Sequence, residues 1–173
     1  MSCNTSLTSI LKNCENNIGG LKAVYLSPVE FVTGVTVVAG QVTAIGMSGS
    51  AKFAEFQFNK NSANYVEDGA AALDAGSTVV TTTTTLSIPR RETAKSNSIR
   101  LIAAGQRDLY LILLDANGNY WFQGYSNYAN LTAFGEGSGA AKADGSKYSL
   151  TFVSEEPELM YTVDPTIIAN IIS

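Results

Sequence analysis

The chain has 173 residues, of which 45% are apolar and 15% are charged, so it is long and apolar enough to fold around one core as a single domain. Its net charge of −4 and its isoelectric point near 4.8 exclude the basic surface that grips a DNA backbone. The low charge content indicates uncharged polar surface of the kind that is buried between subunits.

The sequence contains no histidine, which removes the commonest general base and the commonest transition-metal ligand. Cys3 and Cys14 match no zinc pattern, and we expect both thiols to be reduced. We therefore predict no catalytic, cofactor-binding or metal-binding residue, and no enzyme activity. Residues 1–17 lack the basic start, the long apolar core and the small-residue cleavage site of a signal peptide, and no run approaches 18 apolar residues. We therefore expect the chain to stay in a cytoplasm or to leave it by lysis.

Residues 1–20 are rich in Ser, Thr and Asn and predict an N-terminal arm with at most one helical turn. Leu7, Ile10 and Leu11 form its only apolar cluster. Residues 21–173 predict a single β-rich domain that includes the C-terminal tail. Its first strands are predicted over residues 21–27 and 41–46, while the chain between them is ambiguous.

Residues 52–60 and 78–88 predict the two strands of a long hairpin, because aromatic and β-branched residues favour a pleated sheet. Residues 68–77, rich in Gly, Ala and Asp, form the connection. Side chains alternate between the two faces of a strand, and the face predicted to lie in the core consists of Ala54, Phe56, Phe58, Val80, Thr82, Thr84, Leu86 and Ile88. If the strands pair, one polar face without Lys, Arg or aromatic residues results, made of Glu55, Gln57, Asn59, Thr81, Thr83, Thr85 and Ser87.

Residues 89–104 predict the one helix, with Ser87 as N-cap, Pro89 in the first turn and Gly105 at the end. The side chains expected to face the sheet are Ala94, Ser98, Leu101 and Ile102.

The dipeptide Asn117-Gly118 predicts a type I′ turn that joins strands over residues 108–116 and 119–125. A short strand over 131–134, a mobile loop over 135–146 and a last strand over 147–153 follow. The apolar tail after Pro157 must be covered by another element. We expect residues 1–20, 68–77 and 135–146 to be mobile in the monomer and ordered in an assembly, since their composition builds no core.

Three patterns that suggest a binding site have simpler structural interpretations. The glycines of residues 135–139 lack the βαβ unit of a dinucleotide site and are typical of a linker. Glu155, Glu156 and Glu158 are expected at a solvated strand end. Trp121 is expected in the core of its hairpin and not in a stacking site.

Five segments in order resemble the major tail tube proteins of bacteriophages, in particular those of phages with Bacteroidetes hosts. They are residues 14–26 (CENNIGGLKAVYL), 56–64 (FQFNKNSAN), 86–105, 111–124 (LILLDANGNYWFQG) and 148–165 (YSLTFVSEEPELMYTVDP). The resemblance implies a β-sandwich or barrel with a flanking helix, which forms hexameric rings that stack into a tube. It also implies a place in the virion tail, assembly in the host cytoplasm, other tail proteins as partners at the tube ends, and passage of genome DNA through the lumen without specific binding.

The predicted polar hairpin face suits the wall of such a tube, because it has no arginine forks for phosphate and no aromatic rings for bases. We therefore expect Glu55, Gln57, Asn59, Thr81, Thr83, Thr85 and Ser87 to face the lumen. Two other readings stay open: a different tail or virion subunit, such as a tail-completion or decoration protein, and a small-ligand-binding β-barrel.

Overall fold

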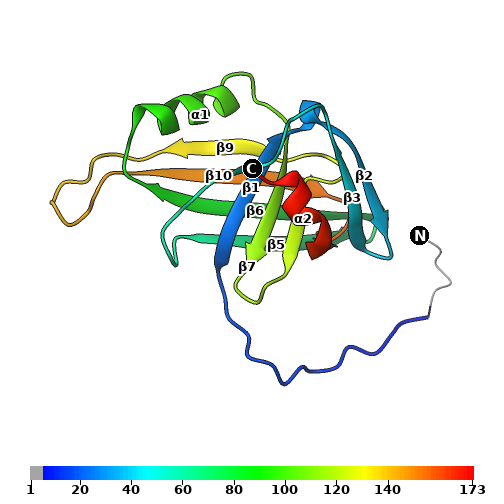
Figure 1. Ribbon diagram of the computed structural model, residues 1–173. Coiled ribbons are helices and arrows are strands. Elements are labelled where there is room, and N and C mark those ends of the chain that lie inside the picture. Colours follow the sequence, from blue (N-terminus) through cyan, green and yellow to red (C-terminus); the bar gives the residue numbers. More distant parts are fainter. Residues whose placement is uncertain (1–5) are drawn as a thin grey trace.

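Two β-sheets pack face to face in the computed structural model, which describes residues 6–173 (Figure 1). The larger sheet contains, in spatial order, β2 (Val32–Val38), β3 (Gln41–Met47), β11 (Tyr161–Val163), β8 (Tyr120–Gln123), β7 (Leu109–Asp115), β1 (Leu21–Pro28) and β4 (Ala54–Glu55). The smaller sheet contains β5 (Ala63–Ala72), β6 (Ser77–Pro89), β10 (Lys147–Glu156) and β9 (Asn130–Gly135). The prediction of a mainly β sandwich with a flanking helix is confirmed.

The seven-stranded sheet is buried on both faces at its central strands β1 and β7, as the nearly continuous apolar sequence of β7 requires, while its edge strand β2 is largely exposed. Leu111 and Leu113 point to the core between the two sheets, where they meet Leu150 and Phe152 of β10. Their neighbour Ile112 points the other way, into a second core. This core includes the buried residues Val42, Phe53, Phe122, Ile168 and Ile171. Each fully buried side chain of this size contributes about 1.5–3 kcal/mol to the free energy of unfolding.

The flanking helix α1 (Thr93–Ala103) begins later than predicted, because β6 extends through Pro89. Ser87 therefore lies in a strand and caps nothing, whereas Gly105 does end the helix, with a φ of 125°. The predicted core-facing set is right for Ile102, which packs against the core, and wrong for Ala94, Ser98 and Leu101, which are exposed. Ile99 is the buried residue of α1.

The apolar tail after Pro157 forms β11 and the C-terminal helix α2 (Pro165–Ile171), and it is buried against the larger sheet as predicted. Asp164 caps the helix by accepting a hydrogen bond from the backbone N–H of Thr166 at 2.9 Å. Ile168 and Ile171 then insert into the second core. The short 3-10 helix Val29–Phe31 (η1) and the hairpin β2–β3 account for the ambiguous stretch after β1.

The predicted hairpin of residues 52–60 with 78–88 is wrong. Residues 52–60 contain only the two-residue strand β4, which pairs with β1, and Phe53, which bridges to Ile172. The partner of β6 is β5, whose register runs from Ala63 opposite Leu86 to Ala72 opposite Ser77. Most of the expected mobile connection, residues 68–77, is thus strand, and only residues 73–76 turn.

The arm extends away from the sandwich (Figure 1). Residues 6–20 contain neither helix nor strand, and Leu7, Ile10 and Leu11 are exposed. The expected helical turn is therefore missing from this described part of the arm. Cys14 is a free, exposed cysteine, while Cys3 lies outside the described residues.

The hairpin β7–β8 is confirmed, but its turn type is not I′. A type I′ turn needs a positive φ at both Asn117 and Gly118. Gly118 has a φ of 95°, but the φ of Asn117 is not positive. The turn instead runs from Asp115 to Gly118, and the glycine at its end is in the left-handed region. The half-buried Trp121 donates a hydrogen bond from Nε1 to Asp115 Oδ2 at 2.9 Å. The interpretation of Trp121 as a structural residue is consistent with this bond.

We expect Asp115→Ala to lower the free energy of unfolding by about 2 kcal/mol, because three donors around a buried carboxylate lose their acceptor. Burial alone would raise the pKa of Asp115, but the hydrogen bonds from Trp121 and Asn119 lower it below its ordinary value. The stabilisation should therefore be present above the unfolded pKa and be lost as the pH falls through the folded pKa. Urea denaturation at pH 7 and pH 3 checks both expectations, with the exposed Asp74→Ala as control. Equal losses in the two variants would contradict them.

Candidate assembly surface

Small, mostly polar side chains line the solvent-facing side of the four-stranded sheet in registered rows. Along β6, Val80, Thr82, Thr84, Leu86 and Ile88 are buried, and the side chains between them are partly exposed, as the alternation predicted. Three rows cross β5, β6 and β10: Asn64, Thr85 and Thr151; Val66, Thr83 and Val153; Asp68, Thr81 and Glu155. These nine residues, with Ser87 and the opposing Ser149, are called the threonine face below.

The threonine face carries no cation and no ring. Its two carboxylates, Asp68 and Glu155, flank Thr81 at one end, so the charge that it does carry repels phosphate. Phosphate is held by guanidinium forks and ammonium groups, and bases are held by stacked aromatic side chains. A nucleic acid that touches this surface therefore finds no group that retains it.

The edges of the four-stranded sheet are open, since β5 and β9 each have a strand on one side only. Neither strand contains Lys or Pro, two residue types that keep natural edges from pairing. Each strand in the order β5, β6, β10, β9 is antiparallel to the next. The two edge strands consequently run in opposite directions, and a rotated second copy can place its β9 antiparallel beside β5.

Beneath the threonine face, a buried polar clamp joins the two sheets. Thr84 Oγ1 donates to Gln123 Oε1 of β8 at 2.6 Å, and Gln123 Nε2 donates to the carbonyl of Thr82 at 3.1 Å. Thr82, Thr84 and Gln123 are each fully buried. Alternation predicted the burial of the two threonines, but no local signal pointed to Gln123 as their partner.

Of the acidic run at the end of β10, only Glu155 is fully solvated. Glu156 is buried and accepts hydrogen bonds from the backbone N–H groups of Ser126 at 2.8 Å and Asn127 at 3.2 Å. The prediction of a solvated strand end is thus wrong for Glu156. Glu158 accepts from the hydroxyl of Tyr161 at 2.8 Å; this bond and burial raise the pKa of Tyr161 to about 12.

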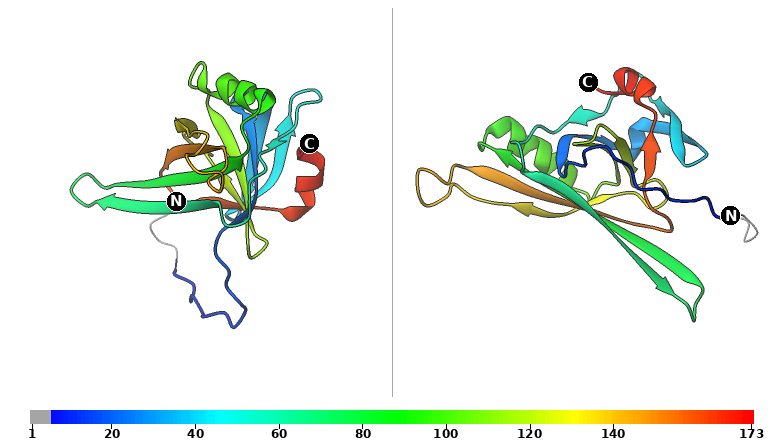
Figure 2. Two further views of the ribbon diagram at one scale, coloured as in Figure 1. Left: turned by 90° about the vertical axis from the view of Figure 1, so that its left-hand side faces the viewer. Right: turned by 90° about the horizontal axis from the view of Figure 1, so that it is seen from below.

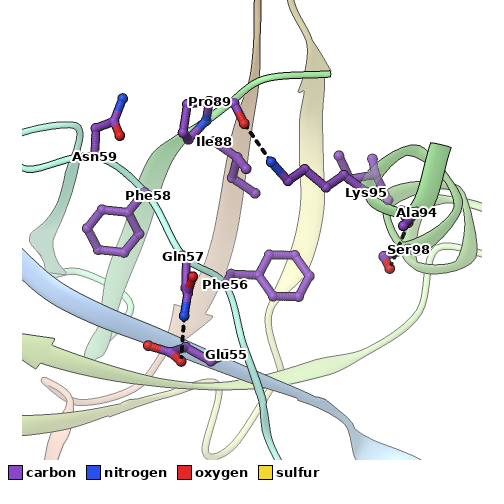
Figure 3. Close-up of a pocket in the computed structure, with 11 residues that line it drawn as sticks. Glu55, Phe56, Gln57, Phe58, Asn59, Ile88, Pro89, Ala94, Lys95 and Ser98 are labelled. Carbon is purple, nitrogen blue, oxygen red and sulfur yellow. Dashed lines mark hydrogen bonds between the residues drawn. The ribbon is translucent and has the colours of Figure 1, made fainter. Parts of the chain in front are cut away.

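Glu55, Gln57 and Asn59 lie apart from the threonine face. They belong to the strap of residues 51–62, which crosses from the larger sheet to the smaller one and borders a cavity of about 470 Å³ beside α1 (Figure 3). The structure therefore brings together Thr81, Thr83, Thr85 and Ser87, and separates the other three predicted lumen residues from them.

The strap cavity is lined mainly by apolar atoms, including those of Phe56, Phe58 and Ile88 (Figure 3). Its polar groups are engaged with one another: Gln57 Nε2 donates to Glu55 Oε2 at 3.2 Å, and Lys95 Nζ donates to the carbonyl of Pro89 at 2.7 Å. No nucleophile with an adjacent base is among the residues that line it.

Within residues 6–173, no three His, Cys, Asp or Glu side chains gather closely enough to hold a metal ion. No helix in the same range is long and apolar enough to cross a membrane. Comparison of the chain with protein-family models, with curated proteins and with solved structures finds no match.

Proposed function

We propose that this chain is a non-enzymatic structural subunit of a virion, the major tail tube protein of a bacteriophage, whose stacked hexameric rings form the conduit for genome DNA. One observation carries the proposal: the threonine face lies on a sheet whose two free edges are antiparallel to each other. The subunit is assembled in the host cytoplasm, takes no cofactor, and has other copies of itself and the proteins at the tube ends as partners.

Joining β5 of one copy to β9 of the next extends the sheet without changing the alternation of strand direction. A ring of copies closes this extended sheet into a barrel and removes every open edge of the smaller sheet. With the six copies that the resemblance implies, strands about 4.8 Å apart and tilted by about 40° close a barrel roughly 48 Å across between backbones. This width accommodates a DNA duplex and the side chains that line the wall.

In this arrangement the threonine face forms the inner wall, so Thr81, Thr83, Thr85 and Ser87 keep their proposed place in the lumen. Asn64, Val66 and Asp68 of β5 replace Glu55, Gln57 and Asn59 as the neighbours that complete the wall on that side. The buried seven-stranded sheet lies outside and supports the barrel.

The test is disulfide cross-linking between the two edge strands. In a chain with Cys3→Ser and Cys14→Ser, Asn64→Cys on β5 is combined in turn with a cysteine at residue 130, 133 or 135 of β9, the positions that share its face of the sheet. We expect one of these registers to give a ladder of covalent oligomers on oxidation, and electron microscopy to show rings and tubes. Asn64→Cys alone is the matched control, which should give no ladder.

Two results would count against the tube. Cross-linking of Asn64→Cys alone into dimers would indicate an isologous β5–β5 pair, and persistent monomers in every register would exclude edge pairing. Rings that form but never extend would favour the tail-completion or decoration subunit. The strap cavity favours the ligand-binding alternative, which predicts a monomer that binds small apolar probes there.

A further inference from the structure

Charge is unevenly distributed along the chain. Residues 61–89 contain Glu67, Asp68 and Asp74 but no Lys or Arg, and residues 148–173 contain four acidic residues and again no Lys or Arg. Residues 90–100, in contrast, contain Arg90, Arg91, Lys95 and Arg100 against one acidic residue, Glu92. A separation of this kind has structural consequences only if the fold keeps the segments apart.

The fold places these segments at opposite ends of the same strands. The loop of residues 135–146 adds Glu136, Lys142 and Asp144 to the end with residues 90–100, which keeps a surplus of positive charge. Lys147 starts β10 opposite Pro89, and Glu156 ends β10 opposite Val80, a span of about 30 Å at the usual rise per residue. Figure 2 (right) shows the loop of residues 135–146 at one end of the sheet and the turn of the β5–β6 hairpin at the other. We call Asp68, Asp74 and Glu155 the acidic end, and Arg91, Arg100 and Lys147 the basic end.

The side chains of both ends are available for contacts with another molecule. Those of the acidic end are exposed, as are those of the basic end. The ion pairs found among the described residues are Arg90–Glu92, Lys95–Glu92 and Arg107–Glu30, so none of them involves either named set. Glu67 and Glu156, by contrast, are engaged inside the fold through backbone N–H groups and are left out of the acidic end.

The ends also differ in shape in a complementary way. The β5–β6 hairpin projects beyond the sandwich, with Leu73 at its turn 92% exposed beside Asp74 (Figure 2). At the basic end, an open depression lies between α1 and β10, where Arg91 and Arg100 meet Tyr148. Arg91 stacks on the Tyr148 ring at 5.0 Å, which keeps its guanidinium at the rim of the depression.

We propose that the acidic end of one copy docks against the basic end of a second copy, head to tail along the strand direction. The inference rests on the proposed tube in one respect: in a closed barrel the strand ends form the two rims, so this contact is the one that stacks rings. Edge pairing would then build each ring, and charge pairing would fix the polarity of the stack, since like ends repel. Exposed charges are screened within about 10 Å at 0.1 M salt, so the stack should shorten as salt increases.

The experiment uses two charge-reversal variants of the full chain. Variant A carries Asp74→Lys and Glu155→Lys, which makes both ends basic; variant B carries Arg100→Glu and Lys147→Glu, which makes both ends acidic. Controls with the same change in net charge elsewhere are Glu15→Lys with Glu55→Lys, and Lys12→Glu with Lys22→Glu. Tube length is measured by electron microscopy at 50 mM and 500 mM NaCl, and folding is checked by thermal unfolding.

We expect A alone and B alone to form rings but at least tenfold fewer stacked rings than the wild type, while both controls form normal tubes. An equimolar mixture of A and B should restore tubes in which the two alternate, because each basic end then meets an acidic one. Rescue by mixing also shows that neither variant was merely misfolded.

Normal tubes from A alone or B alone, or no rescue on mixing, would overturn the inference and leave the tube proposal standing. Salt-sensitive open filaments of wild-type chain without rings would support the head-to-tail contact and overturn the tube, and a wild type that stays monomeric at both salt concentrations would overturn both.

Discussion

Tubes assembled from a Thr83→Arg variant should retain duplex DNA at low salt, whereas wild-type tubes should release it. Thr83 lies in the central row of the threonine face, between Val66 and Val153 on the neighbouring strands. An arginine there adds one guanidinium per subunit and therefore a circle of them per ring. Each phosphate contact makes the affinity for DNA depend more steeply on salt. With six to ten contacts, the affinity falls about 10³–10⁵-fold between 50 and 200 mM salt.

The variant should fold normally, because Thr83 is partly exposed and surface substitutions change the free energy of unfolding by about 0.5 kcal/mol or less. The measurement is co-sedimentation of a linear duplex that is present during tube assembly, at 50 mM and 200 mM NaCl. Thr36→Arg, on the exposed side of β2, adds the same charge to the outer wall and is the matched control. Equal retention of DNA by the two variants, or by neither, would show that the threonine face is not the inner wall.

The parts of the threonine face that could be predicted are those that depend on residues close together in the sequence. The alternation in residues 78–88 is local: a strand places successive side chains on opposite faces, so the buried and exposed sets of β6 can be assigned without knowing its partner. The β7–β8 hairpin is similarly local, because Asn117-Gly118 separates two apolar runs. Its turn type depended on a single φ angle at Asn117, which the dipeptide does not determine.

The partner of β6 was not predictable in this way. Phe56 and Phe58 alternate with polar residues and are typical of a strand, yet both rings pack against the core from the irregular strap. Phe53, which is out of this alternation, is the fully buried ring of the strap, and Ala54 is exposed. The real partner, β5, contains Gly69 and three consecutive alanines, which have low strand propensity. Pairing along the whole of β6 stabilises it, so tertiary context overrides the local preference at both sites.

The buried threonines are a third case. Their place in the alternation predicts that Thr82 and Thr84 are inside. The Thr82 hydroxyl has no partner among the described residues. The Thr84 hydroxyl has one that the local sequence does not supply. That partner, Gln123, is 39 residues from Thr84 and follows a run of aromatic residues in β8. Long-range hydrogen bonds of this kind can be found only once the two sheets are placed against each other.

A double-mutant cycle should show that Thr84 and Gln123 act as a unit. Gln123→Ala removes both hydrogen bonds of the clamp and opens a cavity between the sheets, so we expect it to lower the free energy of unfolding by about 3 kcal/mol. Thr84→Val keeps the shape of the side chain but leaves Gln123 Oε1 without its donor, at a cost of about 1–2 kcal/mol.

The double variant Thr84→Val with Gln123→Leu should cost less than the sum of Thr84→Val and Gln123→Leu alone, because neither apolar side chain leaves the other's polar partner unsatisfied. Urea denaturation followed by the fluorescence of Trp121, the only tryptophan, gives the four free energies of the cycle. Thr85→Val, one position along β6 on the threonine face, is the control and should change the free energy of unfolding by about 0.5 kcal/mol or less. Strictly additive losses would mean that packing alone, and not the hydrogen bond between Thr84 and Gln123, holds the four-stranded sheet against the seven-stranded one at this point.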